Sequence, residues 1–256
     1  MADKLIDIHC HLQHEKFAQN RNEVIAEARQ KMEFLIIAGA NPEWNRKAIT
    51  LSEEHKGFIH AIIGLHPVDA IKHSEKEFAD ELEFIHKSAN SKKIVGIGEI
   101  GLDYHWIKDE KDRTIQKNRF EKLLALAEEL NLPVVIHSRN AESDAIKMLS
   151  EHRLKNVTMH CFSGSKEEMT NALKCGFYIS FSTAIAYSKS AKKLARDCTL
   201  DHMMVETDAP YLDPEHKINV PWNTAIVIKK IAEAKKLPEE TVLKQIIKNA
   251  KNVFGI

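Results

Sequence analysis

Short apolar runs rich in β-branched residues alternate with amphipathic stretches along this chain, and this alternation limits the possible folds more than any other feature. Eight runs have the pattern of buried strands, and the stretches between them repeat apolar residues at helical spacing. The predicted strands are residues 4–8, 34–38, 58–63, 94–98, 133–136, 157–160, 177–181 and 203–206. Because eight strand–helix units form a parallel sheet that closes on itself, we predict a (β/α)8 TIM barrel of the α/β class.

The length of 256 residues suits one such barrel, for which ~250 residues are typical. No low-complexity segment or linker divides the chain, so we predict a single domain over residues 1–256. An open doubly wound sheet is the alternative fold, which is disfavoured because no GxGxxG turn follows the first strand. Helices are expected over residues 115–130 and 222–236, and from Pro238 to the KNVFG segment.

The overall charge and composition give no sign of a nucleic-acid or membrane partner. The 37 basic and 37 acidic side chains balance, so there is no global field to attract nucleic acid or a membrane. We interpret the lysines within 189–193 and 229–236 as solvated helix faces. Four cysteines without CxxC spacing are expected to be buried, reduced thiols. Without a signal-peptide pattern or a run of ~20 apolar residues, we expect a cytoplasmic monomer that makes no membrane contact.

Histidine and acidic residues stand at or just past the ends of five predicted strands. The C-terminal ends of barrel strands converge on one site, and imidazole and carboxylate groups are ligands of divalent ions. These residues therefore predict a metal centre. The candidate ligands are His9, His11, Glu99, His137, His160 and Asp208.

Their spacing indicates individual roles. His9 and His11 are two residues apart on a strand, so both side chains face the barrel interior. Asp7 shares this face and is expected to accept a hydrogen bond from a ligand imidazole. Glu99 is the candidate to bridge two ions, which a carboxylate is able to do and a histidine is not. Asp208 is expected to bind metal and to orient or deprotonate the attacking water.

Two further polar residues, Glu206 and His66, each allow two interpretations. Glu206 shares a face with Asp208, and either accepts a hydrogen bond from a ligand or binds metal directly. His66, in the GLHP segment, is either a turn histidine held by Pro67 or a group that steadies charge on a phosphoryl oxygen.

The candidate substrate-binding residues follow the fourth and fifth strands. Ser138 and Arg139 offer a hydroxyl and a guanidinium group for an anion such as phosphate. Tyr104, together with His105 and Trp106, either stacks on a nucleic-acid base or packs the loop.

The chain resembles the TatD family of metal-dependent deoxyribonucleases, within the amidohydrolase-like barrels, over nearly its whole length. The matching motifs are DIHCHL (7–12), GLHP (64–67), GEIGLDY (98–104), VIHSR (135–139), HCFSG (160–164), ETDAPYL (206–212) and NAKNVFG (249–255). The resemblance implies one to three divalent ions on the six candidate ligands. It also implies 3′-to-5′ exonuclease activity on DNA, usually with magnesium, and a cytoplasmic location.

One segment departs from this family's pattern. Members commonly carry a basic RNEP-like stretch after the ETDAPYL loop, whereas this chain has KINVP at 217–221. Ile218 and Val220 stand where arginine and glutamate are usual. If that arginine contacts substrate phosphate, the departure implies weaker DNA binding or a different substrate.

The predicted function is therefore metal-dependent hydrolysis with Mg, Mn or Zn. Its most specific form is 3′–5′ exonuclease cleavage of phosphodiester bonds in single-stranded DNA by a metal-activated water, with Asp208, Glu99 and His66 as catalytic residues. The alternative is a hydrolase of a small amide, ester or lactone at the same metal site, because the ligands suit both reactions. The Ser138–Arg139 pair favours phosphate.

Overall fold

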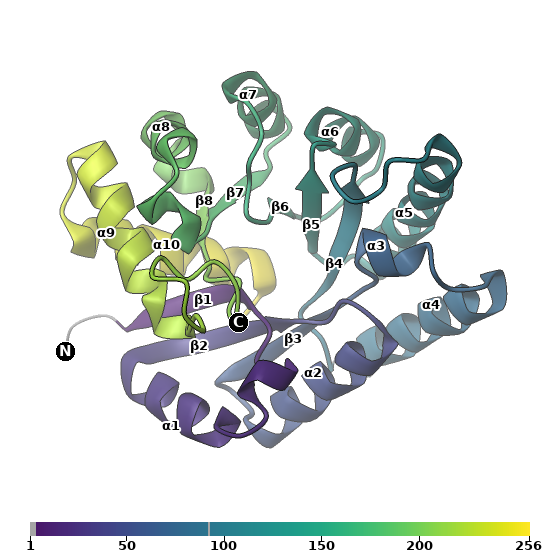
Figure 1. The fold of residues 1–256 in the computed structure, drawn as a ribbon, viewed down its shortest axis with the longest axis horizontal. Coiled ribbons are helices and arrows are strands. Elements are labelled where there is room, and N and C mark those ends of the chain that lie inside the picture. Colours follow the sequence, from purple (N-terminus) through teal and green to yellow (C-terminus); the bar gives the residue numbers. More distant parts are fainter. Residues whose placement is uncertain (1–3, 92) are drawn as a thin grey trace.

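The computed structural model describes residues 4–91 and 93–256 of the chain. Its eight strands lie in one parallel sheet in the order of the sequence, with helices packed around them (Figure 1). The strands are β1 Leu5–Cys10, β2 Met32–Ala38, β3 Ile59–Ile63, β4 Gly96–Asp103, β5 Val134–Arg139, β6 Val157–Met159, β7 Tyr178–Phe181 and β8 Met203–Val205. This arrangement confirms the predicted TIM barrel.

Helices connect the strands and cover the outside of the sheet (Figure 1). They are α1 Arg21–Lys31, α2 Pro42–Glu54, α3 Pro67–Ala70, α4 Glu75–Asn90, α5 Glu110–Leu130, α6 Glu142–Ser150, α7 Lys166–Lys174, α8 Lys189–Asp197, α9 Thr224–Lys235 and α10 Glu239–Phe254. Short 3-10 turns are η1 Glu15–Phe17, η2 Thr183–Ala186, η3 Leu200–His202 and η4 Pro221–Asn223. The predicted helix over 115–130 begins earlier because Asp109 caps it, accepting from the backbone N–H groups of Lys111 and Asp112 at 2.8 and 3.3 Å.

The segment after β8 bonds back to β1 and joins the two ends of the sheet. The N–H of Asp208 donates to the carbonyl of His9 at 3.0 Å, and the N–H of His11 donates to that of Ala209 at 2.7 Å. These bonds lie at the C-terminal end of the strands. Two segments that are 200 residues apart in the sequence thereby hold their candidate ligands side by side.

Asp7 supports the same junction, in a way that the sequence analysis did not predict. Its carboxylate accepts from the backbone N–H groups of His9 and Thr207, at 3.0 and 3.1 Å, and from the Thr207 hydroxyl at 2.5 Å. The predicted hydrogen bond from a ligand imidazole is not formed, because these three nearer donors from β1 and the segment after β8 occupy its oxygens. Asp7 therefore fixes the backbone that carries the candidate ligands.

β4 is longer than predicted, and this changes the site. The strand runs on past Glu99 and pairs with β5 up to Asp103, which lies opposite Arg139. Gly101 permits this course, because its φ of +147° is unfavourable for other residues and an added Cβ would lie 1.9 Å from the carbonyl oxygen of His137. Asp103 consequently reaches the same end of the barrel as Glu99.

The strands form the centre of the core, and almost all of their apolar side chains are buried. The prediction of four buried thiols was wrong in part, since Cys10 and Cys198 are buried but Cys161 is half-buried and Cys175 is exposed. Among the residues that the structure describes, no helix has both the length and the apolar character needed to cross a membrane.

Candidate metal centre

Glu99 lies at the centre of the converging side chains. Its Oε2 atom is 3.5 Å from Nε2 of His9 and 4.0 Å from Nε2 of His11. Its Oε1 atom is 2.7 Å from Nδ1 of His137 and 3.6 Å from Nε2 of His160. The same Oε1 atom is also 3.9 Å from Nε2 of His66. The two carboxylate oxygens therefore face different sets of imidazoles, which is the arrangement that a bridging ligand requires.

The charge of Glu99 is set by its surroundings. Burial acts to raise its pKa, but the positive charge of His160 and the hydrogen bond from His137 outweigh burial, so that the pKa lies well below its usual range. The pKa of His160 shifts in the opposite direction. Burial acts to lower this pKa, but the negative charges of Glu206 and Glu99 raise it to about 10. A cation that binds here would displace this proton.

Asp208 lies beside His11 in the cluster. Its Oδ1 atom is 3.3 Å from Nε2 of His11, and its side chain retains 18% exposure. The backbone of Asp208 has a φ of +58°, a left-handed conformation that aspartate tolerates better than most residues. Burial acts to raise the pKa of this carboxyl, yet the hydrogen bond from His11 and the charge of His160 lower it. The group is therefore a carboxylate at neutral pH.

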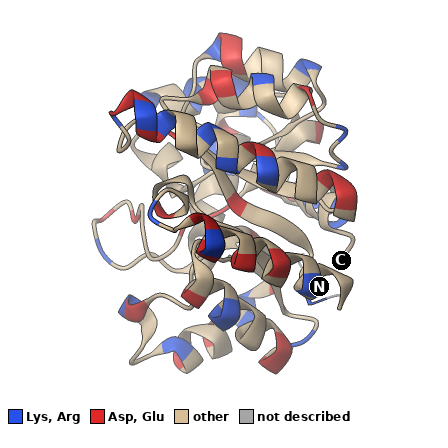
Figure 2. Ribbon diagram, turned by 90° about the vertical axis from the view of Figure 1, so that its right-hand side faces the viewer, with Lys and Arg blue, Asp and Glu red and all other residues tan. Residues whose placement is uncertain are grey.

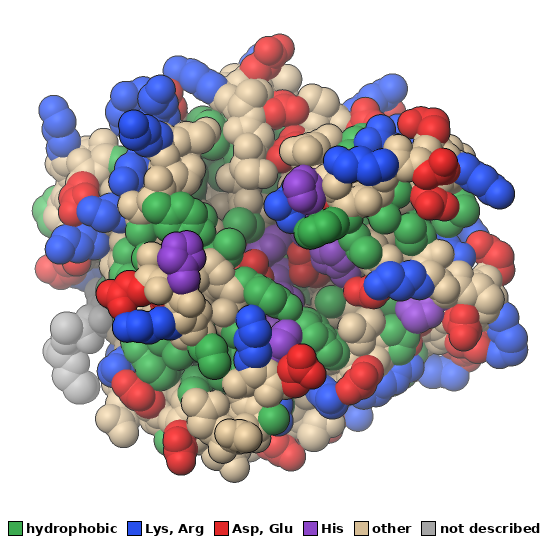
Figure 3. All heavy atoms as spheres, viewed as in Figure 1, with side chains coloured by type: hydrophobic (Ala, Val, Ile, Leu, Met, Phe, Trp, Pro, Cys, Tyr) green, Lys and Arg blue, Asp and Glu red, His purple; other side chains and the backbone are tan. Residues whose placement is uncertain are grey.

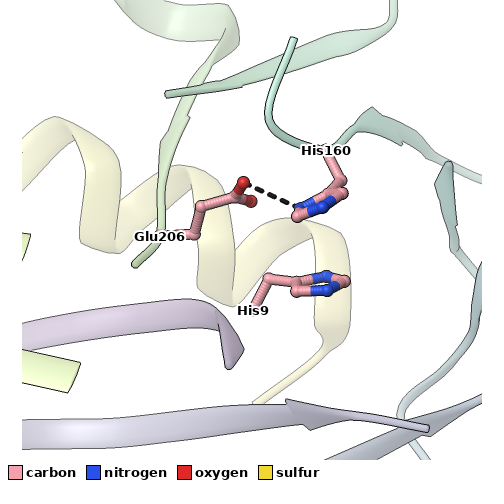
Figure 4. Close-up of side chains that lie close together, drawn as sticks. All are labelled: His9, His160 and Glu206. Carbon is pink, nitrogen blue, oxygen red and sulfur yellow. Dashed lines mark ion pairs between the residues drawn. The ribbon is translucent and has the colours of Figure 1, made fainter. Parts of the chain in front are cut away.

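His160, His9 and Glu206 lie close together and are buried (Figure 4). Nδ1 of His160 is 2.7 Å from Oε1 of Glu206, and the rings of His160 and His9 stack with centroids 3.7 Å apart. Glu206 also accepts from the Cys161 N–H at 2.8 Å and from the Ser180 hydroxyl at 2.6 Å. Glu206 thus lies where it could orient the His160 ring, and its position beside His9 and His160 is also that of a candidate metal donor, so both interpretations of Glu206 stay predictions.

Asp103 is a site residue that the sequence analysis missed. Its Oδ2 atom is 3.0 Å from Nε2 of His137, and its own N–H donates to Gln116 of α5 at 2.9 Å. Glu99 and Asp103 are an even number of positions apart on one strand and so share a face. That signal was available, but the predicted strand ended at residue 98.

The environment of His9 indicates whether a metal ion fits these residues. It is fully buried, and neither of its ring nitrogens has a hydrogen-bond partner among the described residues. Unpaired buried nitrogens are costly unless a ligand satisfies them. Donor atoms within 4.8 Å of one another occur in three groups: His9, His11 and Glu99; His66, Glu99 and His137; and His9, His160 and Glu206. The residues therefore fit one or more divalent ions.

The cluster opens into a cavity of about 510 Å³. Figure 3 shows the corresponding hollow at the centre of the face, with histidine side chains inside it. The rings of Trp44, Trp106 and Tyr211 and the guanidinium of Arg139 form part of its wall. Trp106 is 64% exposed at the rim. Sequence reasoning missed Trp44 and Tyr211, although both follow strand ends, the position that identified the ligands.

Two predicted substrate-binding residues do not line this cavity. Ser138 is adjacent to His137 on β5, so its side chain points to the opposite face of the strand, where it is buried. Tyr104 donates its hydroxyl hydrogen bond to Asp144 at 2.6 Å, and burial together with this bond raises the pKa of Tyr104 to about 12. Tyr104 therefore packs the loop against α6, the second of its two readings.

The KINVP segment holds the loop in place but lacks the charges of the usual arginine and glutamate. The Asn219 amide donates to the carbonyls of Thr207 and Tyr211, at 3.0 and 2.7 Å. Ile218 is 48% exposed, and Val220 packs against the core. The two departures from the usual motif thus remove charge without removing the asparagine that holds the loop bearing Asp208.

The barrel and the histidine–carboxylate cluster at the C-terminal ends of its strands define a metal-dependent hydrolase. A family profile described as TatD related DNase matches residues 6–255, and the chain belongs to this family. It is 38% identical to the uncharacterized metal-dependent hydrolase YabD of Bacillus subtilis, over 98% of this chain and 99% of the relative. It is 29% identical to the 3'-5' ssDNA/RNA exonuclease TatD of Pantoea ananatis, over 98% of this chain and all of that protein. The crystal structure of YJJV, a TatD homologue from Escherichia coli, matches with a TM-score of 0.90 and 25% identity over the full length of both chains.

Replacing Glu206 by glutamine is expected to weaken metal binding by about 10- to 100-fold. The amide presents an N–H group in place of one carboxylate oxygen, so the contact with Nδ1 of His160 is lost or inverted. Titration calorimetry with Mn²⁺ or Zn²⁺ measures the change. Glu81→Gln is the matched control, because this buried carboxylate pairs with Arg46 at 2.5 Å, outside the metal centre. Equal affinities for Glu206→Gln and the control would contradict the orienting role.

Proposed function

We propose that this chain is a 3′–5′ exonuclease that hydrolyses phosphodiester bonds of single-stranded DNA with bound divalent ions. The observation that carries the proposal is the cavity, where Arg139 and the ring of Trp106 stand beside the histidine–carboxylate cluster. A guanidinium suits phosphate, and an exposed ring suits an unpaired base. The name of the Pantoea ananatis relative points to the same substrate class.

Glu99 would bridge two ions in this proposal. His9, His11 and Asp208 would complete one position, and two further histidines, His137 and His160, would complete the other. When bound, Mg²⁺, Mn²⁺ or Zn²⁺ would lower the pKa of water and polarise the phosphoryl group.

Asp208 and His66 have separate tasks around the scissile phosphate. Asp208 accepts the proton of the attacking water on its carboxylate, which the cavity leaves accessible. His66 accepts from the Val68 N–H through Nδ1 at 3.3 Å, so its neutral ring carries the proton on Nε2, 3.9 Å from Glu99. Burial and the charge of His137 lower the pKa of His66 to about 4, which keeps this ring neutral. His66 therefore donates a hydrogen bond to a phosphoryl oxygen.

Trp106→Ala is expected to raise KM for single-stranded DNA about tenfold, since stacking on one aromatic ring stabilises a base by about 1–3 kcal/mol. The exposed ring contributes little to the core, so the fold should be unaffected. Steady-state kinetics with labelled oligonucleotides measure KM. Tyr104→Phe is the control, because its lost hydroxyl faces Asp144 rather than the cavity. An unchanged KM for Trp106→Ala would remove this residue from the substrate path.

The proposed function is tested with single-stranded DNA that carries separate 5′ and 3′ labels, in magnesium, manganese or zinc, with EDTA as control. Metal-dependent early loss of the 3′ label and a ladder of 5′-labelled products are expected. Protein that contains bound metal and cleaves no DNA in any of these metals would refute the nuclease assignment. Turnover of a small amide, ester or lactone by such protein would establish the alternative.

A further inference from the structure

A second polar feature lies outside the metal centre, where α8 and α9 pack side by side (Figure 1). Figure 3 shows basic side chains gathered over this upper-left part of the same face. With Lys236, the two helices carry eight Lys or Arg residues and only two acidic ones, in a chain whose charges balance overall. The groove between them has a volume of about 310 Å³ and is lined by Lys192, Lys193, Arg196 and Lys230, with Glu233 and Ala234.

The lysines at the start of α8 differ from those on α2 and α4. On α2 and α4, lysines pair with an acidic residue one turn away, at 2.5 to 2.6 Å: Lys47 with Glu43, Lys76 with Asp80 and Lys87 with Glu83. Within the described part of the chain, Lys189, Lys192 and Lys193 form no ion pair. The cause is local, because Asp197 is the only acidic residue of α8 and already pairs with Arg196 and Lys166. Three positive charges are thus left for an external anion.

α8 begins close to the metal centre, and the groove lies further along this helix, from Lys192 to Arg196. α8 starts at Lys189, just after β7, and therefore at the end of the barrel where the ligands converge. A small cavity of about 100 Å³ extends from Cys161, the neighbour of His160, to Ser188 at the start of α8. Tyr187 lies next to Ser188 and is 52% exposed. From there α8 leads away from the metal centre over about 14 Å, at 1.5 Å per residue.

We propose that the groove between α8 and α9 binds the phosphodiester backbone of single-stranded nucleic acid, beyond the nucleotides held at the metal centre. The proposal rests on the proposed function, since it places the remainder of the same substrate. Lysines along a groove neutralise successive phosphates and release counterions, while an exposed ring such as that of Tyr187 offers a stacking surface at the entry. The solvated helix faces expected from the sequence become a binding surface because the fold sets two of them side by side.

The shape of the groove favours a nucleic-acid strand over a lipid surface. Binding to a membrane interface requires apolar side chains that insert beside the basic ones. The groove between α8 and α9 is concave and lined by charged residues, and Ala234 is the only apolar residue of its lining. A flexible phosphodiester chain is able to enter such a groove, whereas a flat bilayer contacts only its edges.

The test compares Lys189→Gln/Lys192→Gln/Lys193→Gln with a control of equal charge change on α2 and α4, Lys47→Gln/Lys76→Gln/Lys87→Gln. Fluorescence anisotropy of the metal-loaded proteins follows binding of a phosphorothioate oligonucleotide of about 20 nucleotides, longer than the ~4–16 that one groove covers. We expect the α8 variant to bind about tenfold more weakly at low salt. The slope of log affinity against log salt concentration should be smaller in magnitude by about 2. The control should stay within about twofold of the wild type, and both variants should hydrolyse bis(p-nitrophenyl) phosphate at the wild-type rate.

Equal affinity of the α8 variant and the control would overturn the proposal. Binding to phosphatidylserine vesicles that is lost in the α8 variant, without any loss of DNA binding, would overturn it in favour of a membrane. The result also separates this proposal from the proposed function. Wild-type protein that binds the oligonucleotide through α8 but cleaves no DNA would refute the exonuclease and retain the groove. Cleavage of DNA with the same KM in both variants would support the proposed exonuclease activity and refute nucleic-acid binding by the groove.

Discussion

Glu99→Gln is expected to lower metal-dependent hydrolysis by at least about 1000-fold, which corresponds to several kcal/mol of lost transition-state stabilisation. Its two oxygens face five imidazoles at 2.7 to 4.0 Å, and glutamine replaces one oxygen by an NH₂ group that binds no cation. The second ion would lose its shared ligand, and the remaining histidines would face an uncharged group. The ratio kcat/KM at saturating metal measures the effect, together with the metal content of the purified protein.

The same Glu81→Gln control separates this loss from a general effect of removing a buried carboxylate. Glu81 is as deeply buried as Glu99. Its replacement therefore tests how well the barrel tolerates the loss of a buried carboxylate, without affecting the metal centre. Thermal unfolding of both variants checks the fold. A folded Glu99→Gln variant that keeps wild-type activity and metal content would show that Glu99 is not a bridging ligand.

The fold was predictable because burial on both sides of a parallel sheet leaves a strong mark on the sequence. Each strand of the barrel is a short apolar run, and each run is followed by polar residues where the strand ends. β4 was the exception at its C-terminal end. Glycines interrupt its apolar pattern, and only the close approach of Gly101 to His137 explains why the strand continues. The position of Asp103 depended on this one local feature.

The convergence of the candidate ligands was predictable for a similar reason, but the cavity wall was not. Convergence of strand ends is a property of the barrel, so His9 and Glu99 could be brought together without coordinates. The direction of a loop side chain depends instead on contacts between distant segments. Tyr104 turns away because Asp144, on a later helix, accepts its hydroxyl. The failure at Ser138 was different, since strict alternation along β5 already directs its side chain away from the site.

The charge of α8 shows a third limit of sequence reasoning. Lysines at helical spacing look alike whether they face bulk water or a neighbouring basic helix, and only the packing of α8 against α9 distinguishes the two cases. The neutral net charge of the chain concealed this concentration, because acidic residues on other helices balance it. Net charge therefore predicts the average field of a protein and not the partner of one of its faces.

Asp208→Asn is expected to lower kcat by about 100- to 10000-fold, the range that a positioned general base contributes. Asparagine is the informative substitution because, like aspartate, it tolerates the left-handed backbone at φ +58°. Alanine would add backbone strain to the chemical loss. In Asp208→Asn the hydrogen bond from the backbone N–H to the carbonyl of His9 is kept. The side-chain oxygen 3.3 Å from His11 no longer carries a charge and cannot accept the proton of the attacking water.

The measurement has to separate loss of the base from loss of a ligand. His9, His11 and Glu99 remain as donors in Asp208→Asn, so a high concentration of Mn²⁺ should restore metal content but not kcat. Single-turnover cleavage at increasing metal concentration distinguishes the two effects. If excess metal restores the wild-type rate, Asp208 acts only as a ligand and the proton leaves by another route. If the rate stays low at full occupancy, the carboxylate that the left-handed backbone holds against the cavity is the group that takes the proton.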